Sequence, residues 1–165
     1  MTDWTLVPVG DTEIEAAAKR ARRLVTKRAL LAAGVAMVPV PGVDWLTDVG
    51  VLVKVLPEIN AEFGLTPQQI ERLAPDRRIV AFKVLSAGGG LLVGRVVTRE
   101  LVLQLLKLVG VRLTTQQAAK YVPIAGQAVS AALTFSALKY VCEQHIRQCM
   151  DIARQLQPPV ATEVV

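Results

Sequence analysis

The chain has 165 residues, the length of one ordinary domain, and 52% of them are hydrophobic while only 4% are aromatic. This composition excludes a disordered chain, a collagen-like chain and a disulfide scaffold. The scarcity of aromatic residues, with abundant alanine, valine and leucine, also argues against a β-sandwich or β-barrel. The formal net charge of +5 is concentrated in one segment, whose six cations are Lys19, Arg20, Arg22, Arg23, Lys27 and Arg28.

The first half of the sequence predicts two long helices. Residues 12–37 form the first, which is charged in its first half and apolar in its second, and the proline-containing segment 38–42 ends it. The second covers residues 43–63 and ends at Gly64. Pro57 within it predicts a kink or a division into two helices.

The second half continues with helix signals. Thr66, Pro67 and Gln69 supply an N-cap, a proline at the first helical position and a capping-box partner. The remaining helices are expected at 66–73, at 75–109 with an interruption by glycines 88–90, from Thr114 to 121, and at 127–155.

A weak internal repeat relates the two halves. VPVPG at 38–42 and VPIAG at 122–126 are 84 positions apart, and each separates an alanine-rich helix from a long one. We therefore predict an all-α fold, a compact helical bundle of six to seven helices with two pseudo-repeated hairpins joined by VP-x-x-G turns. The turn residues are Pro39, Pro41, Gly42, Pro123 and Gly126. The expected domain limits are a flexible N-terminus at 1–11, one helical domain at 12–156 and a flexible tail at 157–165.

The basic segment from Lys19 to Arg28 favours an anionic partner. It contains no interleaved aromatic residues, which argues against nucleic acid, because base stacking has nothing to act on. Anionic lipid headgroups suit such a segment, at about 1 kcal/mol per cation near the surface. A solvated helix face without a partner is the alternative interpretation.

Membrane insertion is a further alternative. The longest charge-free stretch covers residues 121–138, at the lower limit for a spanning helix, but Pro123 and several polar residues dilute it. The N-terminus lacks a cationic segment before an apolar run, so no secretory signal is predicted. A compact bundle with the hairpins in water and a bundle with one inserted hairpin both stay open.

The sequence contains few residues in patterns typical of catalytic or metal sites. Cys142, His145 and Cys149 share one face of the last predicted helix, yet a fourth zinc ligand is not evident and the same positions fit a packing stripe. With one histidine and no nucleophile motif, we predict no enzyme, no cofactor and no metal. Both cysteines are expected as reduced thiols in a cytosolic setting, because two helical turns separate them.

Two other patterns in the sequence resemble functional sites. Asp44 and Asp48 lie one turn apart on an apolar helix, so a catalytic pair of carboxylates is one interpretation. We favour a structural one, in which one caps the helix and the other bonds a neighbouring helix or a cation, with Asp48 partly buried. The segment 89–96, GGLLVGRV, begins like a phosphate-binding loop but places Arg95 and Val96 where lysine and a hydroxyl residue are needed. Close helix packing at these glycines is the better explanation.

The segments VPVPGVDWLTDVGVLVKVLPEINAEFGLTPQQIERL and KYVPIAGQAVSAALTFSALKYVCEQHIRQCMDIARQL resemble two signatures of known helical proteins. They are similar to the C-terminal helical domain of interferon-inducible, immunity-related GTPases and to the bacterial YcjF-like family of GTPase-associated membrane proteins. The resemblance spans roughly residues 25–156 and implies an all-α domain associated with GTPases or membranes. This chain has no G domain, so GTP hydrolysis is not implied.

These observations lead to two functional hypotheses. The first is a non-catalytic helical module that binds a partner protein, such as a separately encoded GTPase, or an anionic membrane surface, with homo-oligomerisation left open. The second is an integral or bilayer-inserting protein with apolar hairpins. Either hypothesis places the protein in the cytoplasm or at the inner face of the membrane.

Overall fold

The computed structural model describes residues 7–36, 43–87, 92–105 and 126–157, without the side chains of 35–36, 43–48 and 126–134. The described part is helical and contains no strand. Its helices are α1 (Asp11–Ala36), α2 (Val43–Glu62), α3 (Pro67–Glu71), α4 (Pro75–Ser86) and α6 (Gly126–Gln155). Residues 99–105 form a further helical stretch. The predicted all-α class is therefore confirmed for these residues, whereas the VP-x-x-G turns lie largely outside them.

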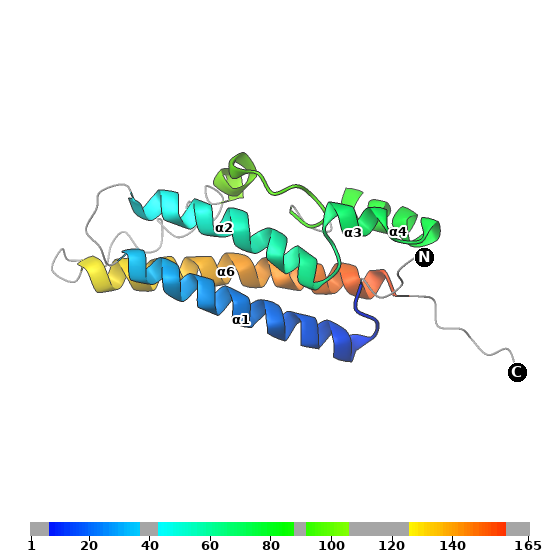
Figure 1. The fold of residues 1–165 in the computed structure, drawn as a ribbon, viewed down its shortest axis with the longest axis horizontal. Helices are drawn as coiled ribbons and strands as arrows, with labels where there is room; N and C mark the ends of the chain where they lie inside the picture. Colours follow the sequence, from blue (N-terminus) through cyan, green and yellow to red (C-terminus); the bar gives the residue numbers. More distant parts are fainter. Residues whose placement is uncertain (1–6, 37–42, 88–91, 106–125, 158–165) are drawn as a thin grey trace, which may run out of the picture.

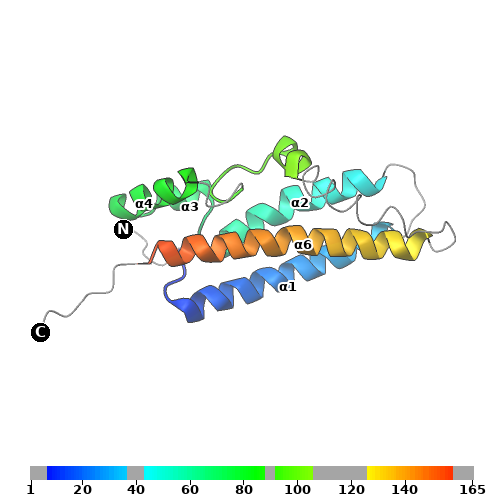
Figure 2. The same cartoon turned by 180° about the vertical axis from the view of Figure 1, so that it is seen from behind.

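The long helices α1, α2 and α6 form the body of the described part (Figure 1). α1 runs antiparallel to α2 and to α6, while α2 and α6 run in the same direction, and the view from behind shows the same arrangement (Figure 2). α3 and α4 lie beside the end of this body where α6 finishes.

The core is aliphatic and follows helical spacing on each long helix. On α1 the buried residues are mostly alanines, whose small side chains allow neighbouring helices to approach closely. On α2 larger residues are buried at positions that recur every three or four residues. The buried residues of these two stripes are Ile14, Ala17, Ala18, Ala21, Val25, Ala29 and Ala32 on α1, and Val49, Leu52, Val55, Leu56 and Ile59 on α2, with Phe63 buried just after α2 ends.

Local signals set the helix ends. α2 passes through Pro57 as one helix, so of the two predicted outcomes, a kink or a division, the division is wrong. The helix is followed by Gly64 with a φ of +67°. This left-handed conformation suits glycine because it has no Cβ. The predicted capping box of α3 is confirmed: the Thr66 hydroxyl accepts from the Gln69 amide, and the Gln69 side chain accepts from the Thr66 amide.

Two expectations about the chain's course need correction. The helix predicted at 75–109 is broken, because α4 ends at Ser86 and residues 92–98 are not helical, with Gly94 in a turn at a φ of +68°. The helical unit also begins before residue 12. Val7 is buried, and the Gly10 amide donates to Oε1 of Gln157 at 2.8 Å, which ties the start of α1 to the end of α6.

Candidate anionic-surface site on α1

The cations of α1 divide into two groups because of the helix's orientation. The inward side of α1 faces α2 and α6, so cations at its edges reach carboxylates on those helices. The outward side carries the remaining cations. The six residues predicted to bind an anionic surface therefore do not form one patch.

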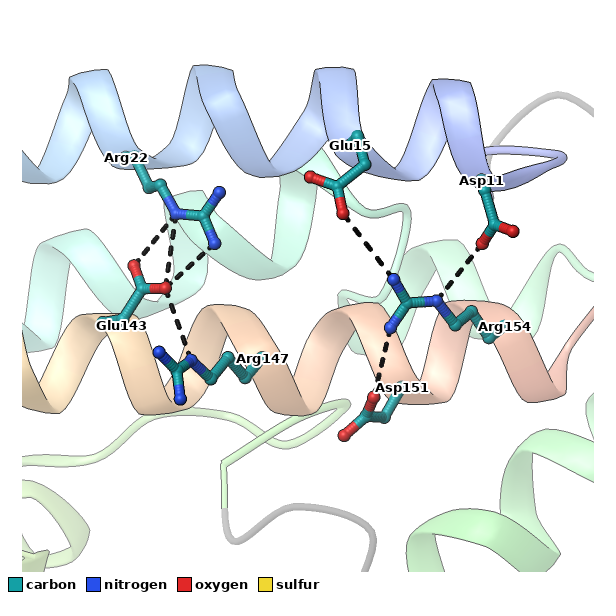
Figure 3. Close-up of polar contacts among 7 residues, drawn as sticks. All are labelled: Asp11, Glu15, Arg22, Glu143, Arg147, Asp151 and Arg154. Atoms are coloured by element: carbon teal, nitrogen blue, oxygen red, sulfur yellow. Dashed lines mark hydrogen bonds and ion pairs between the residues drawn. The ribbon is translucent and has the colours of Figure 1, made fainter.

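Arg22 joins α1 to α6. Its Nη2 and Nε donate to the two carboxylate oxygens of Glu143 at 2.9 and 3.0 Å, a fork-shaped pairing (Figure 3). These hydrogen bonds lower the pKa of Glu143 and raise that of Arg22, although partial burial opposes both shifts. Arg147 lies 3.5 Å from the same carboxylate. Arg22 therefore links α1 to α6 and is not available as part of an exposed basic patch.

Two other cations join α1 to α2. Arg20 pairs with Glu62 at 2.8 Å, and Arg28 pairs with Glu58 at 2.9 Å. Both pairs are partly exposed, so each contributes little to stability, but each neutralises one cation of the predicted patch.

The other three cations form an exposed stripe. Lys19, Arg23 and Lys27 are spaced four residues apart, so they lie on one side of α1. All three are exposed, and none has an ion pair among the described residues. Leu30 and Leu31 follow on the same side, 59% and 60% exposed. We call these five residues the α1 stripe.

The opposite end of α1 has the opposite charge. Asp11 and Glu15 lie 3.3 and 3.7 Å from Arg154 of α6, which also contacts Asp151 (Figure 3). Acidic residues at a helix N-terminus are favourable because they face the positive end of the helix dipole. Along α1 the exposed surface therefore changes from acidic to basic to apolar.

The last helix contains a buried polar cluster that sequence reasoning identified only in part. As predicted, Cys142, His145 and Cys149 are buried in the core stripe of α6. His145 Nε2 lies 2.8 Å from Oδ1 of Asn60. Because that amide oxygen only accepts, Nε2 carries the hydrogen. Asn60 Nδ2 in turn donates to the Leu92 carbonyl oxygen at 3.2 Å. Asn60 was missed, and its only signal was an amide inside an apolar helix.

The protonation states of this cluster keep it neutral. Burial lowers the pKa of His145 to about 4 and raises the pKa of Cys142 to about 12, and it raises that of Cys149 as well. At neutral pH the thiols are protonated and the imidazole is uncharged, so Cys149 is not an activated nucleophile. The described residues contain no group of three or more potential metal ligands. The cluster fixes packing between α2, α6 and the segment at Leu92.

The phosphate-loop-like segment packs closely, as predicted, at the glycine that the structure describes. A Cβ on Gly94 would lie 2.7 Å from Ile70 Cδ1 and 2.8 Å from Leu85 Cδ1. The glycine thus allows the turn to sit against α3 and α4.

The predicted turn and polar residues lie mostly outside the described part. Pro39, Pro41, Gly42 and Pro123 are not described, and Gly126 begins α6. Asp44 and Asp48 lie on α2, but their side chains are not described, so the burial of Asp48 stays a prediction.

Comparison of the chain with protein families, curated proteins and solved structures returns no match. Among the helices in the described ranges, none combines the length and apolarity needed to cross a bilayer.

Proposed function

We propose that the protein is a non-catalytic helical module that binds an anionic membrane surface through the α1 stripe. The observation that carries the proposal is the position of three exposed cations and two exposed leucines on one side of one helix. Lysine and arginine pair with lipid phosphates, while leucine side chains enter the boundary between headgroups and acyl chains.

The number of cations in the α1 stripe sets the expected strength of membrane binding. Three cations at about 1 kcal/mol each supply roughly half of what six would supply at low salt. Burial of the two leucines adds a contribution that salt does not screen. Binding is therefore expected to be reversible and to weaken as salt rises.

Vesicle flotation tests the proposal. The variant Lys19→Gln/Arg23→Gln/Lys27→Gln should lose binding to vesicles containing phosphatidylserine, while neither protein should bind pure phosphatidylcholine. A matched control, Lys83→Gln/Arg95→Gln/Arg99→Gln, removes the same charge from exposed positions elsewhere and should bind as the wild type does. Equal losses in both variants, or binding by the first variant at the wild-type level, would overturn the α1 stripe as the site.

The leucines have their own test. Leu30→Ser/Leu31→Ser keeps all cations, so it should bind at low salt and be released at a lower salt concentration than the wild type. A variant with unchanged salt resistance would remove the leucines from the site.

A protein partner is the second candidate function, and the exposed surface of α4 favours it. Ile79, Val80 and Phe82 are exposed on this helix, beside the exposed cations Arg78 and Lys83. A partner with an apolar surface bordered by acidic residues complements this arrangement. The sequence resemblance suggests a separately encoded GTPase.

Site-specific cross-linking tests this second proposal. A photo-reactive residue at position 82 should capture a GTPase in the native cell, whereas the same residue at the exposed position 140 should not. Capture of a second copy of this chain, or no capture at position 82, would overturn it.

A further inference from the structure

A hollow of about 210 Å³ lies between α1 and α2, lined by Arg28, Gly50, Val51 and Lys54. Two of its four lining residues are cations, one from each helix. The volume is below the roughly 300–1,000 Å³ of pockets for drug-sized ligands, so the hollow suits a small group.

The charges of the hollow favour an anion. Arg28 donates from Nη2 to Glu58 Oε1, and this is its one hydrogen bond among the described residues, which leaves the other nitrogens of its guanidinium available. Lys54 is exposed and has no ion pair in the described part of the chain. Glu58 offsets one of these charges without lining the hollow, and exposed Lys27 lies next to Arg28 in sequence. Among the side chains that the structure describes, the surroundings stay net positive.

Gly50 adds no side chain to the hollow, although the fold does not need a glycine there. Its φ is not in the left-handed region, and a Cβ built on it would meet no atom within 4 Å. Glycine inside a helix lowers stability relative to alanine. The missing side chain thus has a cost for the helix, and it leaves the hollow unfilled at this position.

We infer that this hollow binds a phosphate monoester. The planar guanidinium of Arg28 can hold two phosphate oxygens, and the ammonium group of Lys54 approaches from the facing helix as a point charge. Val51 supplies an apolar wall for the carbon group that carries the phosphate. The ligand source is either a soluble phosphate ester or the headgroup of phosphatidic acid. The inference goes beyond the α1 stripe and stands without it, because a soluble ester is measured without a bilayer.

Calorimetric titration with glycerol 1-phosphate tests the inference on the full chain. Gly50→Leu fills the hollow with a side chain that the helix tolerates, so thermal stability should stay or rise while binding falls roughly tenfold or more. Lys54→Gln should also weaken binding roughly tenfold. Gly34→Leu is the matched control: Gly34 has equally open space but does not line the hollow, so binding should not change.

Vesicles distinguish the two sources. If the lipid is the ligand, Gly50→Leu should float less with vesicles containing phosphatidic acid and equally with vesicles containing phosphatidylserine, a phosphodiester. If the soluble ester is the ligand, Gly50→Leu should leave both flotations unchanged. The inference would be overturned if Gly50→Leu bound glycerol 1-phosphate as well as the wild type does. It would also be overturned if the wild type bound neither glycerol 1-phosphate nor phosphatidic acid. If the proposal for the α1 stripe is wrong, the result is a different one: the Lys19→Gln/Arg23→Gln/Lys27→Gln variant still floats with phosphatidylserine vesicles.

Discussion

The body formed by α1, α2 and α6 differs from α4 in how its helices are stabilised. Each long helix presents a continuous buried stripe, whereas α4 buries Ala81 alone among its twelve residues. Both regions are helical, although they differ in how many side chains they bury. Because isolated helices of this length are marginal in water, most of the stability must come from the three-helix body. Two phenylalanines, Phe63 after α2 and Phe82 on α4, allow a direct test of this difference.

The largest expected effect is at Phe63, whose side chain is 0% exposed. Phe63→Ala should lower the free energy of unfolding by about 3–5 kcal/mol, because it removes a buried ring and leaves a cavity. Urea denaturation followed by circular dichroism measures this value. A loss below about 1 kcal/mol would show that the body is not the source of stability.

The next effect concerns pH and His145. Its pKa of about 4 in the folded protein is below the ordinary value of 6.5, so between these values the unfolded chain binds more protons. Stability should therefore fall as pH decreases from 6.5 to 4, by about 3 kcal/mol in total, and His145 should contribute no further loss below that. Urea denaturation across this range measures the change.

His145→Gln is the control for this prediction. A glutamine can still donate to Asn60 Oδ1 but does not titrate, so most of the pH dependence between 6.5 and about 4.5 should disappear. Below that range Glu143 adds its own loss, because its pKa is lowered in the folded protein. An unchanged slope in the variant would contradict a buried neutral histidine.

A smaller effect is expected for the pair that joins α1 to α6. A double-mutant cycle with Arg22→Gln and Glu143→Gln should give a coupling of about 0.5–1 kcal/mol, since the pair is partly exposed and solvent screens it. The coupling should decrease in high salt. A coupling near zero would mean that the fork-shaped geometry adds nothing to stability.

The smallest effect is expected at Phe82, which is 54% exposed on α4. Phe82→Ala should change the free energy of unfolding by no more than about 0.5 kcal/mol, measured as for Phe63→Ala. A loss approaching that of Phe63→Ala would show that α4 contributes to stability as the three long helices do, and would contradict the difference described above.

Much of the secondary structure followed from the sequence because its signals are local. The capping box at Thr66 and Gln69, and the left-handed Gly64, depend on residues a few positions apart. The same holds for the buried stripe of α6, which includes Cys142, His145 and Cys149 at helical spacing. The error at 92–98 has a tertiary cause, since Asn60 binds the Leu92 carbonyl and Gly94 packs against α3 and α4.

The candidate sites depended on tertiary structure. The sequence by itself determined that six cations are clustered between Lys19 and Arg28, and that helical spacing aligns Lys19, Arg23 and Lys27. Only the packing of α2 and α6 against α1 decided which cations are neutralised, because Arg22 meets a carboxylate 121 positions away. The hollow at Gly50 arises in the same way: its two cations come from separate helices, and their distance along the chain carries no sign of their proximity in space.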